Sequence, residues 1–456
     1  MLPMLEIILR KIGFSNLGKR PNLFKILKNA VWLFADKIVR MGAGIFVGVQ
    51  IARYLGPDQY GLFNYVLAFS ALFGILGTLS LDNFIIKELL TPDADQDTLL
   101  GTAFVMRLVG SVVGLGLSIW CIYLMRKGDT QVTWLMAITS ASFVYQSLYV
   151  IDFYFQAHLK SKYSFIAQNS AFIVLSIVKI VLLIRKGSLQ AFVIASSLEF
   201  LLAGIFFIFS FKYCGQRVLT WRYSGRLARK LLKESYPLIL SGFAVLVYTR
   251  LDQVMLGQML NDRAVGIYSA AVKISEVWYF IPIAIASSLF PSLIRAREES
   301  LELYTKRLQQ AYDFMAMLGL IVSIGITFVA HFVIVFLYGH QYAMAANILS
   351  VSIWTGALIC ISTINGRWLL LEGLQFYTFM YTVIGAVINF VANLFFIRRF
   401  GAIGAAYGTL LAQTVPVLVG LSIKKLRGNT LMMLKSLIFP FRYLKEAIAK
   451  SKTTSR

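Results

Sequence analysis

The stretch 236-YPLILSGFAVLVYTRLDQVMLGQML-260 decides what kind of protein this chain is. It is long and apolar enough to form a helix that crosses roughly 30 Å of hydrocarbon, yet it contains Arg250 and Asp252. A charge at the centre of a membrane helix costs about 2.5–3.5 kcal/mol on the insertion scale, so two charges nearly cancel what the aliphatic residues contribute. Neighbouring helices or water must therefore shelter these two side chains.

The composition extends this interpretation to the whole chain. Of 456 residues, 58% are hydrophobic and only 14% are charged, whereas a soluble domain carries about a quarter charged residues. A β-barrel is excluded, because its strands would alternate apolar and polar residues. We therefore expect an all-α polytopic membrane protein with about 12 transmembrane helices. The apolar segments lie near residues 31–52, 60–80, 98–125, 132–157, 164–184, 189–211, 236–260, 265–294, 312–337, 346–371, 375–397 and 403–423.

The distribution of basic residues predicts the orientation. If the N-terminus and every second loop are assigned to one side, that side holds 29 of the 44 Lys and Arg residues. The excess places this side, with both termini, in the cytoplasm. The net charge of +23 is then explained by loops and tails that touch anionic lipid, and no nucleic acid partner is expected. The first apolar run begins near Val31 without a small-residue cleavage site, so no secretory signal is expected.

A long basic loop divides the spans into six plus six, the geometry of parallel repeats. The segments 55-LGPDQYGLF-63 and 260-LNDRAVGIY-268 match weakly after the first span of each half. The basic part of the loop, residues 222–235, is expected to lie along the inner membrane surface. The expected order is a basic cytoplasmic N-terminal segment 1–30, an N-lobe 31–211, a basic cytoplasmic linker 212–235, a C-lobe 236–423 and a basic cytoplasmic tail 424–456.

Charges within the spans are the candidate functional residues. The basic residues are Lys37, Arg40, Arg107, Lys179, Arg250, Lys273 and Arg367, and the clearest acidic residues are Asp36, Glu199, Asp252 and Glu276. Side chains three or four residues apart face each other on a helix. Asp36 can therefore pair with Arg40, and Lys273 with Glu276. Arg250 and Asp252 are two residues apart, so each needs a partner on another helix.

Two interpretations remain open for these charges. They could form interhelical ion pairs that fix the packing, or they could line a water-filled cavity with a cationic surface. In the second case an anionic cargo is favoured, because Arg suits the planar oxygens of phosphate. Desolvated acids can carry protons or bind Na⁺. The residues expected to bind substrate are Arg40, Arg107, Lys179, Arg250, Lys273, Asn389 and Asn393; those expected to couple to ions are Asp36, Glu199, Asp252 and Glu276.

No catalytic or metal-binding pattern accompanies these charges. The three Cys and three His residues show no disulfide or metal-ligand spacing. We therefore expect no catalytic residues, no metal and no cofactor.

Four stretches carry a resemblance to a known family: residues 29–69, residues 235–295, 337-LYGHQYAMAANILSVS-352 and 398-RRFGAIGAAYGTLLAQ-413. They resemble the polysaccharide-export branch of the multidrug/oligosaccharidyl-lipid/polysaccharide (MOP) flippase superfamily, in particular the O-antigen flippases (Wzx). The resemblance implies a MOP/MATE-like fold with two six-helix lobes around a central cavity. It also implies a bacterial inner-membrane flippase that moves an undecaprenyl-diphosphate-linked oligosaccharide from the cytoplasmic to the periplasmic leaflet by alternating access, coupled to H⁺ or Na⁺. The implied partners are this polyprenyl-diphosphate-linked oligosaccharide, membrane lipids, a polysaccharide polymerase and a chain-length regulator.

The alternatives differ in cargo or in class. A multidrug-extrusion antiporter shares the superfamily, but a cationic cavity disfavours cationic drugs. Lipid II flippases usually have two further spans. A membrane-embedded polysaccharide polymerase or ligase would carry long extracytoplasmic loops, which this chain lacks. A purely structural subunit does not explain the charges that have no partner on their own helix.

Overall fold

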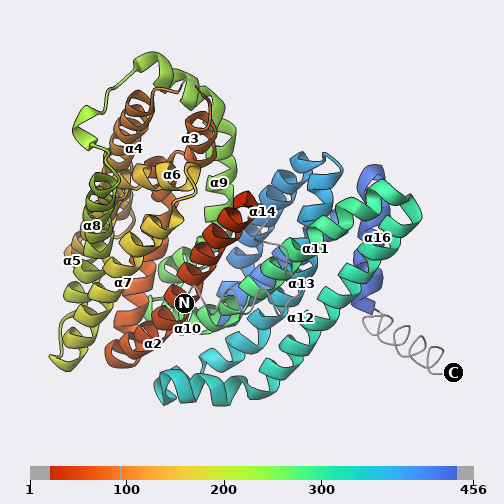
Figure 1. Cartoon of the computed structure of the whole chain (residues 1–456). Helices are drawn as coiled ribbons and strands as arrows, with labels where there is room; N and C mark the ends of the chain where they lie inside the picture. The colour runs from red at the N-terminus through yellow and green to blue at the C-terminus, as the bar shows by residue number, and fades with distance from the viewer. Residues whose placement is uncertain (1–20, 93, 439–456) are drawn as a thin grey trace. The chain divides into compact units, whose positions relative to one another are not determined.

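The computed structural model describes residues 21–92 and 94–438, and for residues 21–39 the backbone alone. Every element in this part of the chain is a helix, which confirms the all-α class (Figure 1). Eleven helical segments are long and apolar enough to cross a membrane. The first of them, residues 40–89, has 50 residues. Because about 20 helical residues cross a hydrocarbon core, this segment is long enough for two crossings. The expectation of about twelve spans is consistent with this count.

Gly56 divides the long first helix, α2 (Pro21–Thr78), into two spans. Its backbone lies at φ 72° and ψ 170°, outside the helical region, and Pro57 follows it. A positive φ is accessible to glycine without a side-chain clash, and proline is well tolerated at the first position of a new helix. The sequence 55-LGPDQYG-61 therefore acts as the turn that the apolar pattern places between spans 1 and 2.

The chain forms two compact units. Unit 1 comprises residues 1–48 and 73–239, and unit 2 comprises residues 49–72 and 240–456. Residues 49–72, which the span pattern assigns to the N-lobe, thus pack with the second unit. Two helices, α2 and α9 (Gly225–Met259), run from one unit into the other.

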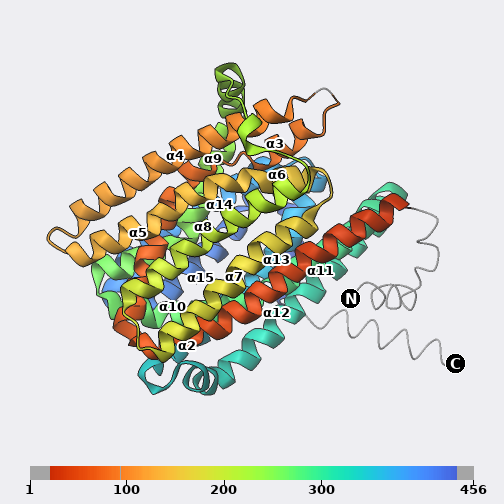
Figure 2. The same ribbon diagram turned by 60° about the vertical axis from the view of Figure 1, so that its left-hand side comes forward.

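Unit 1 is built largely from helical hairpins. Helices α4 and α5 form one antiparallel pair and α7 and α8 another (Figure 2). Its helices after α2 are α3 (Asp82–Leu89), α4 (Gln96–Met125), α5 (Thr130–Gln146), η2 (Ser147–Tyr149), α6 (Val150–Ala157), α7 (Ser161–Ile184), α8 (Leu189–Tyr213), η3 (Val218–Thr220) and the first part of α9. The short helix η2 interrupts the expected span 132–157, and the adjoining α6 contributes Val150, Ile151 and Phe155 to the apolar core.

The basic linker, residues 212–235, packs on α3 and α4 within unit 1 and continues as α9. The Arg222 N–H donates to the Asp97 carbonyl at 3.2 Å, and the Ser224 N–H donates to Thr102 Oγ1 at 3.0 Å. The Lys230 ammonium pairs with Glu88 of α3 at 2.7 Å. Residues 225–235 are therefore not a separate surface helix. They form the first three turns of α9, which continues through Pro237 into the seventh span.

Unit 2 contains the remaining helices, and its core lies around α12 and α13. Their bounds are α10 (Asp262–Val277), α11 (Phe280–Glu299), α12 (Leu301–Tyr338), η4 (His340–Tyr342), α13 (Ala345–Leu371), α14 (Gln375–Phe400), α15 (Ala402–Val419) and α16 (Lys424–Ile438). The expected span 265–294 is broken at Trp278, where α10 ends. The Trp278 ring lies against Gly356 of α13, where a Cβ atom would come within 2.5 Å of it. The absence of a side chain on Gly356 thus allows the Trp278 ring to pack closely on α13.

Two glycines allow α2 and α10 to cross with their backbones in contact. A Cβ atom on Gly61 would lie 1.7 Å from the Asp262 carbonyl oxygen, and one on Gly266 would lie 2.0 Å from the Pro57 carbonyl oxygen. The ion pair between Arg263 and Asp58, at 3.2 Å, lies beside this crossing. The segments 55–63 and 260–268, which resemble each other in sequence, therefore also pack against each other within unit 2.

Candidate functional site

Unit 1 brings two of its intramembrane cations to one carboxylate. Lys179 of α7 donates to Glu199 Oε2 of α8 at 3.0 Å, and Arg40 Nη1 of α2 lies 3.9 Å from Glu199 Oε1. The Arg40 guanidinium also lies 5.6 Å from the centre of the Phe172 ring. Periodicity along one helix could not predict this cluster, because each charged residue comes from a different helix.

Arg107 lies elsewhere in unit 1 and is part of its interior. Its side chain is buried, with 4% of the residue exposed, and it lies 5.4 Å from the ring centre of Phe153. Asp82 and Asp152 supply the nearby negative charge. In this structure Arg107 therefore contacts core residues, whereas sequence reasoning placed it among the cargo-binding residues. Asp36 lies in α2, but its side chain is outside the described residues.

Unit 2 contains a buried carboxylate held by neutral donors. Asp252 of α9 is 5% exposed and accepts hydrogen bonds from Tyr268 at 2.5 Å, Thr409 at 2.5 Å and Asn393 at 2.6 Å. Within the described part of the chain no Lys or Arg forms an ion pair with it. A buried anion without a counter-charge is costly. This arrangement therefore suits the binding of a cation.

The surrounding oxygens strengthen that conclusion. The Thr409 hydroxyl has one hydrogen but two acceptors within reach, Asp252 Oδ2 at 2.5 Å and the Ala405 carbonyl at 3.0 Å. When this hydrogen points to the Ala405 carbonyl, Thr409 Oγ1 and Asp252 Oδ2 face each other with no proton between them. Asn393 Oδ1 is buried and has no hydrogen-bond partner among the described residues. A small hard cation, or a proton, would satisfy these groups.

A second acid, Glu276 of α10, lies close to this carboxylate. Asp252 and Glu276 both line a small cavity of about 100 Å³. Arg250 and Lys273 are the positive charges that act on Glu276, and Lys273 also lies 5.8 Å from the ring centre of Tyr60. Among the ion pairs that the structure describes, none joins Lys273 to Glu276. Among the same ion pairs, none joins Arg250 to Asp252, as their two-residue spacing predicts.

The asparagines belong to the Asp252 cluster. Asn389 and Asn393 are both 0% exposed, and Asn393 donates to Asn389 Oδ1 at 3.2 Å. Their helical spacing correctly predicted one shared face, but the structure places them beside the candidate ion-coupling residue and away from solvent. Sequence reasoning missed Tyr268 and Thr409. Their only signal is that each is a hydroxyl within an apolar span.

Eleven long, apolar helical segments define a multi-pass membrane protein. The fold is similar to that of the lipid II flippase MurJ in an inward closed conformation, with a TM-score of 0.70 at 18% identity over 91% of this chain and 92% of that one. It is also similar to an inward-facing multidrug resistance MATE family transporter of the MOP superfamily, with a TM-score of 0.68 at 14% identity over 87% of this chain and 95% of that one. These likenesses confirm the MOP/MATE-like fold.

The chain belongs to the polysaccharide biosynthesis protein family, whose model matches residues 26–297, more than half of its length. A Shigella dysenteriae protein, provisionally named an O-antigen transporter, is 24% identical over 71% of this chain and 81% of its own length. The Haloferax volcanii protein AglR, provisionally named a flippase, is 30% identical over 37% of this chain and 36% of its own length. The chain is accordingly a transporter of the flippase type and not an enzyme.

Proposed function

We propose that this protein moves an oligosaccharide carried on a polyprenyl diphosphate from the cytoplasmic to the periplasmic leaflet of a bacterial inner membrane by alternating access, driven by a Na⁺ or H⁺ gradient. Family membership and the O-antigen transporter relative support the cargo class. The arrangement of the intramembrane charges supports the mechanism. It also disfavours a multidrug-extrusion role, because a cationic surface repels cationic drugs.

The cargo headgroup is recognised in unit 1 by Arg40 and Lys179. Both cations share Glu199, and a diphosphate carries more negative charge and more acceptor oxygens than one carboxylate. A diphosphate can therefore attract both donors away from Glu199, and Arg presents a planar fork that matches phosphate oxygens. Glu199 would then balance the two cations whenever the headgroup is absent. Arg250 and Lys273 provide further positive charge in unit 2.

Coupling is assigned to the Asp252 cluster. The observation that carries it is a buried carboxylate with three neutral hydrogen-bond donors and no ion-pair partner among the described residues. Na⁺ would bind to Asp252 with the oxygens of Thr409 and the asparagines, or a proton would neutralise the carboxylate. In this assignment Asn389 and Asn393 serve the ion and not the glycan. Glu276, on the same small cavity, is a second protonatable group.

Reconstitution tests both parts of the proposal. The purified protein is placed in liposomes containing a short oligosaccharide on polyprenyl diphosphate, and transfer between leaflets is measured with a Na⁺ gradient, a pH gradient or neither. We expect a gradient of one ion to accelerate transfer and a neutral polyprenyl glycoside to remain in its leaflet. Transfer that needs no gradient would contradict coupling. Equal transfer of the neutral glycoside would contradict recognition of the diphosphate.

The orientation is part of the same proposal. Both termini are placed in the cytoplasm because most Lys and Arg residues lie on that side. Single cysteines in a background without Cys121, Cys214 and Cys360 test this with a membrane-impermeant thiol reagent. A cysteine near Gly128, between α4 and α5, should react from outside, whereas one near Gly215 should not. Co-purification with a polysaccharide polymerase and a chain-length regulator tests the proposed protein partners.

A further inference from the structure

Unit 2 contains a pocket whose lining carries no charge. It lies between α9, α13, α14 and α15 and has a volume of about 330 Å³, within the range of about 300–1,000 Å³ that is typical of small-molecule sites. Among the described residues that line it, none is Asp, Glu, Lys, Arg or His. A buried charge without a partner is costly, so this lining favours an uncharged ligand.

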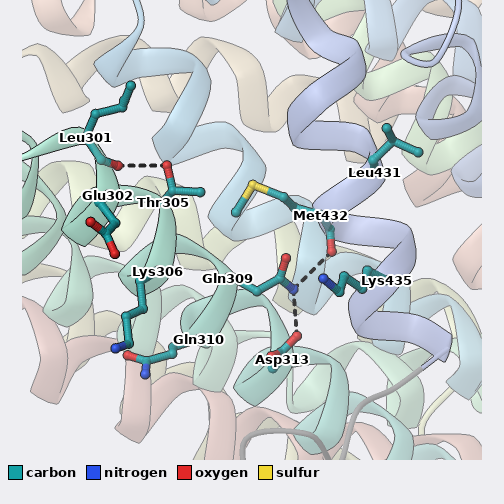
Figure 3. A pocket seen from close by; sticks show the side chains of 10 residues that line it. All are labelled: Leu301, Glu302, Thr305, Lys306, Gln309, Gln310, Asp313, Leu431, Met432 and Lys435. Atoms are coloured by element: carbon teal, nitrogen blue, oxygen red, sulfur yellow. Dashed lines mark hydrogen bonds between the residues drawn. The ribbon is translucent and has the colours of Figure 1, made fainter.

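A second pocket of unit 2, where α12 and α16 meet, has a different character. It has a volume of about 930 Å³, and its walls come from one face of the first part of α12 and from α16 (Figure 3). Its buried acid, Asp313, accepts hydrogen bonds from Gln309 and Ser436, both at 2.7 Å. The charged residues of its lining are Glu302, Lys306, Asp313 and Lys435. The two pockets therefore suit different ligands, and only the first disfavours an ionic group.

Polar groups on the wall of the uncharged pocket lack partners within the described part of the chain. Asn365 is 5% exposed, and its Oδ1 accepts a hydrogen bond from Asn429 at 2.8 Å, whereas its amide nitrogen donates to no described group. The Ser362 hydroxyl accepts from Gln413 Nε2 at 3.4 Å and likewise donates to no described group. A ligand with several hydroxyls satisfies such a wall, because each hydroxyl both donates and accepts.

Two tyrosine rings add aromatic surface to the same pocket. Tyr248 and Tyr381 both line it, and the Tyr248 hydroxyl donates to Gln413 Oε1. Aromatic rings supply a large apolar contact area. A sugar ring presents hydroxyls at its rim and C–H groups on its faces, so it matches a wall of hydroxyls, amides and aromatic rings. Water matches only the polar groups, and an acyl chain matches only the rings.

The pocket lies near the turn that joins α13 to α14. Helix α13 ends at Leu371 and helix α14 begins at Gln375. Ser362 precedes the end of α13 by about 14 Å along the helix, and Thr378 follows the start of α14 by about 5 Å. Because the hydrocarbon core is roughly 30 Å thick, the pocket lies in the half of the membrane nearer this turn. The turn follows the tenth span, and the proposed orientation places it on the cytoplasmic side, where the cargo is loaded.

From the uncharged lining, the unpartnered amide and hydroxyl and the two tyrosine rings we propose that this pocket binds an uncharged sugar residue of the lipid-linked oligosaccharide. The inference rests on the proposed function and assigns a second part of the cargo to unit 2. The Ser362 hydroxyl and the Asn365 amide donate to oxygens of the sugar, and a tyrosine ring packs on its face. A uronic acid does not fit, because its carboxylate meets no cation among the lining residues.

The test uses the full chain, purified in detergent, and three lipids that share undecaprenyl diphosphate. One carries a trisaccharide of neutral hexoses, one carries a trisaccharide of hexuronic acids and one carries no sugar. Binding is measured by native mass spectrometry and by the rise in melting temperature. We expect the neutral glycolipid to bind about tenfold more tightly than the sugar-free lipid, the effect of one or two hydrogen bonds. Equal binding of these two lipids would overturn the inference and leave the proposed function intact, whereas failure of all three to bind would overturn both.

Gly366 provides a way to fill the pocket. It lines the pocket, and no atom lies within 4 Å of a Cβ added to it. Gly366→Leu should therefore lower the affinity for the neutral glycolipid about tenfold, to that of the sugar-free lipid, and leave the affinities for the other two lipids unchanged. Gly325→Leu, on α12, is the matched control, because its added Cβ also meets no atom within 4 Å.

A second variant keeps the inference testable if Gly366→Leu does not fold. Thr378→Val/Thr382→Val removes two hydroxyls from the wall at nearly constant volume and should weaken only the neutral glycolipid. A preference for the neutral glycolipid that survives both variants would show that the sugar binds elsewhere. An equal loss of affinity for the uronic acid lipid would show that the pocket does not select an uncharged sugar.

Discussion

Glu199 in unit 1 and Asp252 in unit 2 are both carboxylates within membrane spans, but different chemistry surrounds them. Glu199 is met by an ammonium at 3.0 Å and a guanidinium at 3.9 Å. Asp252 is met by two hydroxyls and an amide. A carboxylate that already has cations beside it can release them to a stronger anion. One that has only neutral donors still requires a cation. In the proposed mechanism, this difference assigns the anionic headgroup to unit 1 and the coupling ion to unit 2.

The largest expected effect is the loss of transport in Asp252→Asn. Asparagine can still accept hydrogen bonds but cannot hold a cation, so ion-driven transfer should fall to background while the protein still folds. Wild-type protein should be stabilised by the coupling ion, by about 2.7 kcal/mol at a hundredfold excess over the dissociation constant. The variant should show no such gain.

Transfer assays and melting curves with and without Na⁺ check this prediction. Asp58→Asn, which removes an exposed carboxylate, is the control and should retain the response to the ion. If Asp252→Asn transported at the wild-type rate with its ion dependence intact, Asp252 would not be the ion-coupling carboxylate.

The second prediction concerns the cation pair of unit 1. Lys179→Met leaves Glu199 with the more distant Arg40, so we expect a loss of about 1–3 kcal/mol, between the values for exposed and buried pairs. Lys179→Met/Glu199→Gln removes both charges and should recover most of the stability. Transport should remain impaired in both variants, because the cargo contact is missing. Urea or thermal unfolding, together with the transfer assay, measures the two effects separately.

Recovery of transport in the double variant would show that Lys179 serves packing alone. That outcome would favour the interhelical ion-pair interpretation over the cationic surface. It would also remove the contrast between the two units on the cargo side.

A third prediction tests whether backbone packing holds the Asp252 cluster together. Gly266 lies two residues before Tyr268, and a Cβ atom there would approach the Pro57 carbonyl within 2.0 Å. Gly266→Ala should therefore displace α10, cost about 1–3 kcal/mol and weaken ion binding through Tyr268. Gly116→Ala in unit 1 is the matched control, because no atom lies within 4 Å of its added Cβ. Ion-dependent melting of both variants provides the measurement, and an unchanged ion response in Gly266→Ala would argue against the crossing as a support for the site.

The smallest expected effect concerns a third kind of carboxylate, one that faces water. Asp95 caps α4 by accepting hydrogen bonds from the Thr98 hydroxyl at 2.6 Å and its N–H at 3.2 Å. These bonds lower the pKa of Asp95 below its usual value. Its stabilisation is therefore complete above pH about 4 and is lost as the pH falls through the lowered pKa.

Asp95→Ala should cost about 0.5–1 kcal/mol at pH 7, the value of an N-cap, and nothing in transport. The difference in melting temperature from wild type should shrink on acidification below pH 4. A transport defect as large as that of Asp252→Asn would mean that the two kinds of carboxylate are not separable by their surroundings.

The sequence by itself determined the all-α membrane class and the approximate positions of the spans. It also identified the charged residues within those spans, which cannot face lipid. It determined them because hydrocarbon penalises polar groups so strongly that length and apolar composition alone identify a span. The spacing of Arg250 and Asp252 also showed that they point in different directions, and the spacing of Asn389 and Asn393 that they share a face.

Only the tertiary structure decided which helices supply the partners. Lys179 meets Glu199, Asp252 meets Tyr268 and Thr409, and Asp313 meets Ser436 across separate helices. Helical periodicity is local and reaches three or four residues, whereas these pairs are 16 to 157 residues apart. For the same reason, helical periodicity could not predict that Gly61 and Gly266 lie where α2 and α10 cross. Whether a charged side chain is paired, solvated or available to a ligand depends on the packing of one helix against another, and that packing is a property of the whole fold.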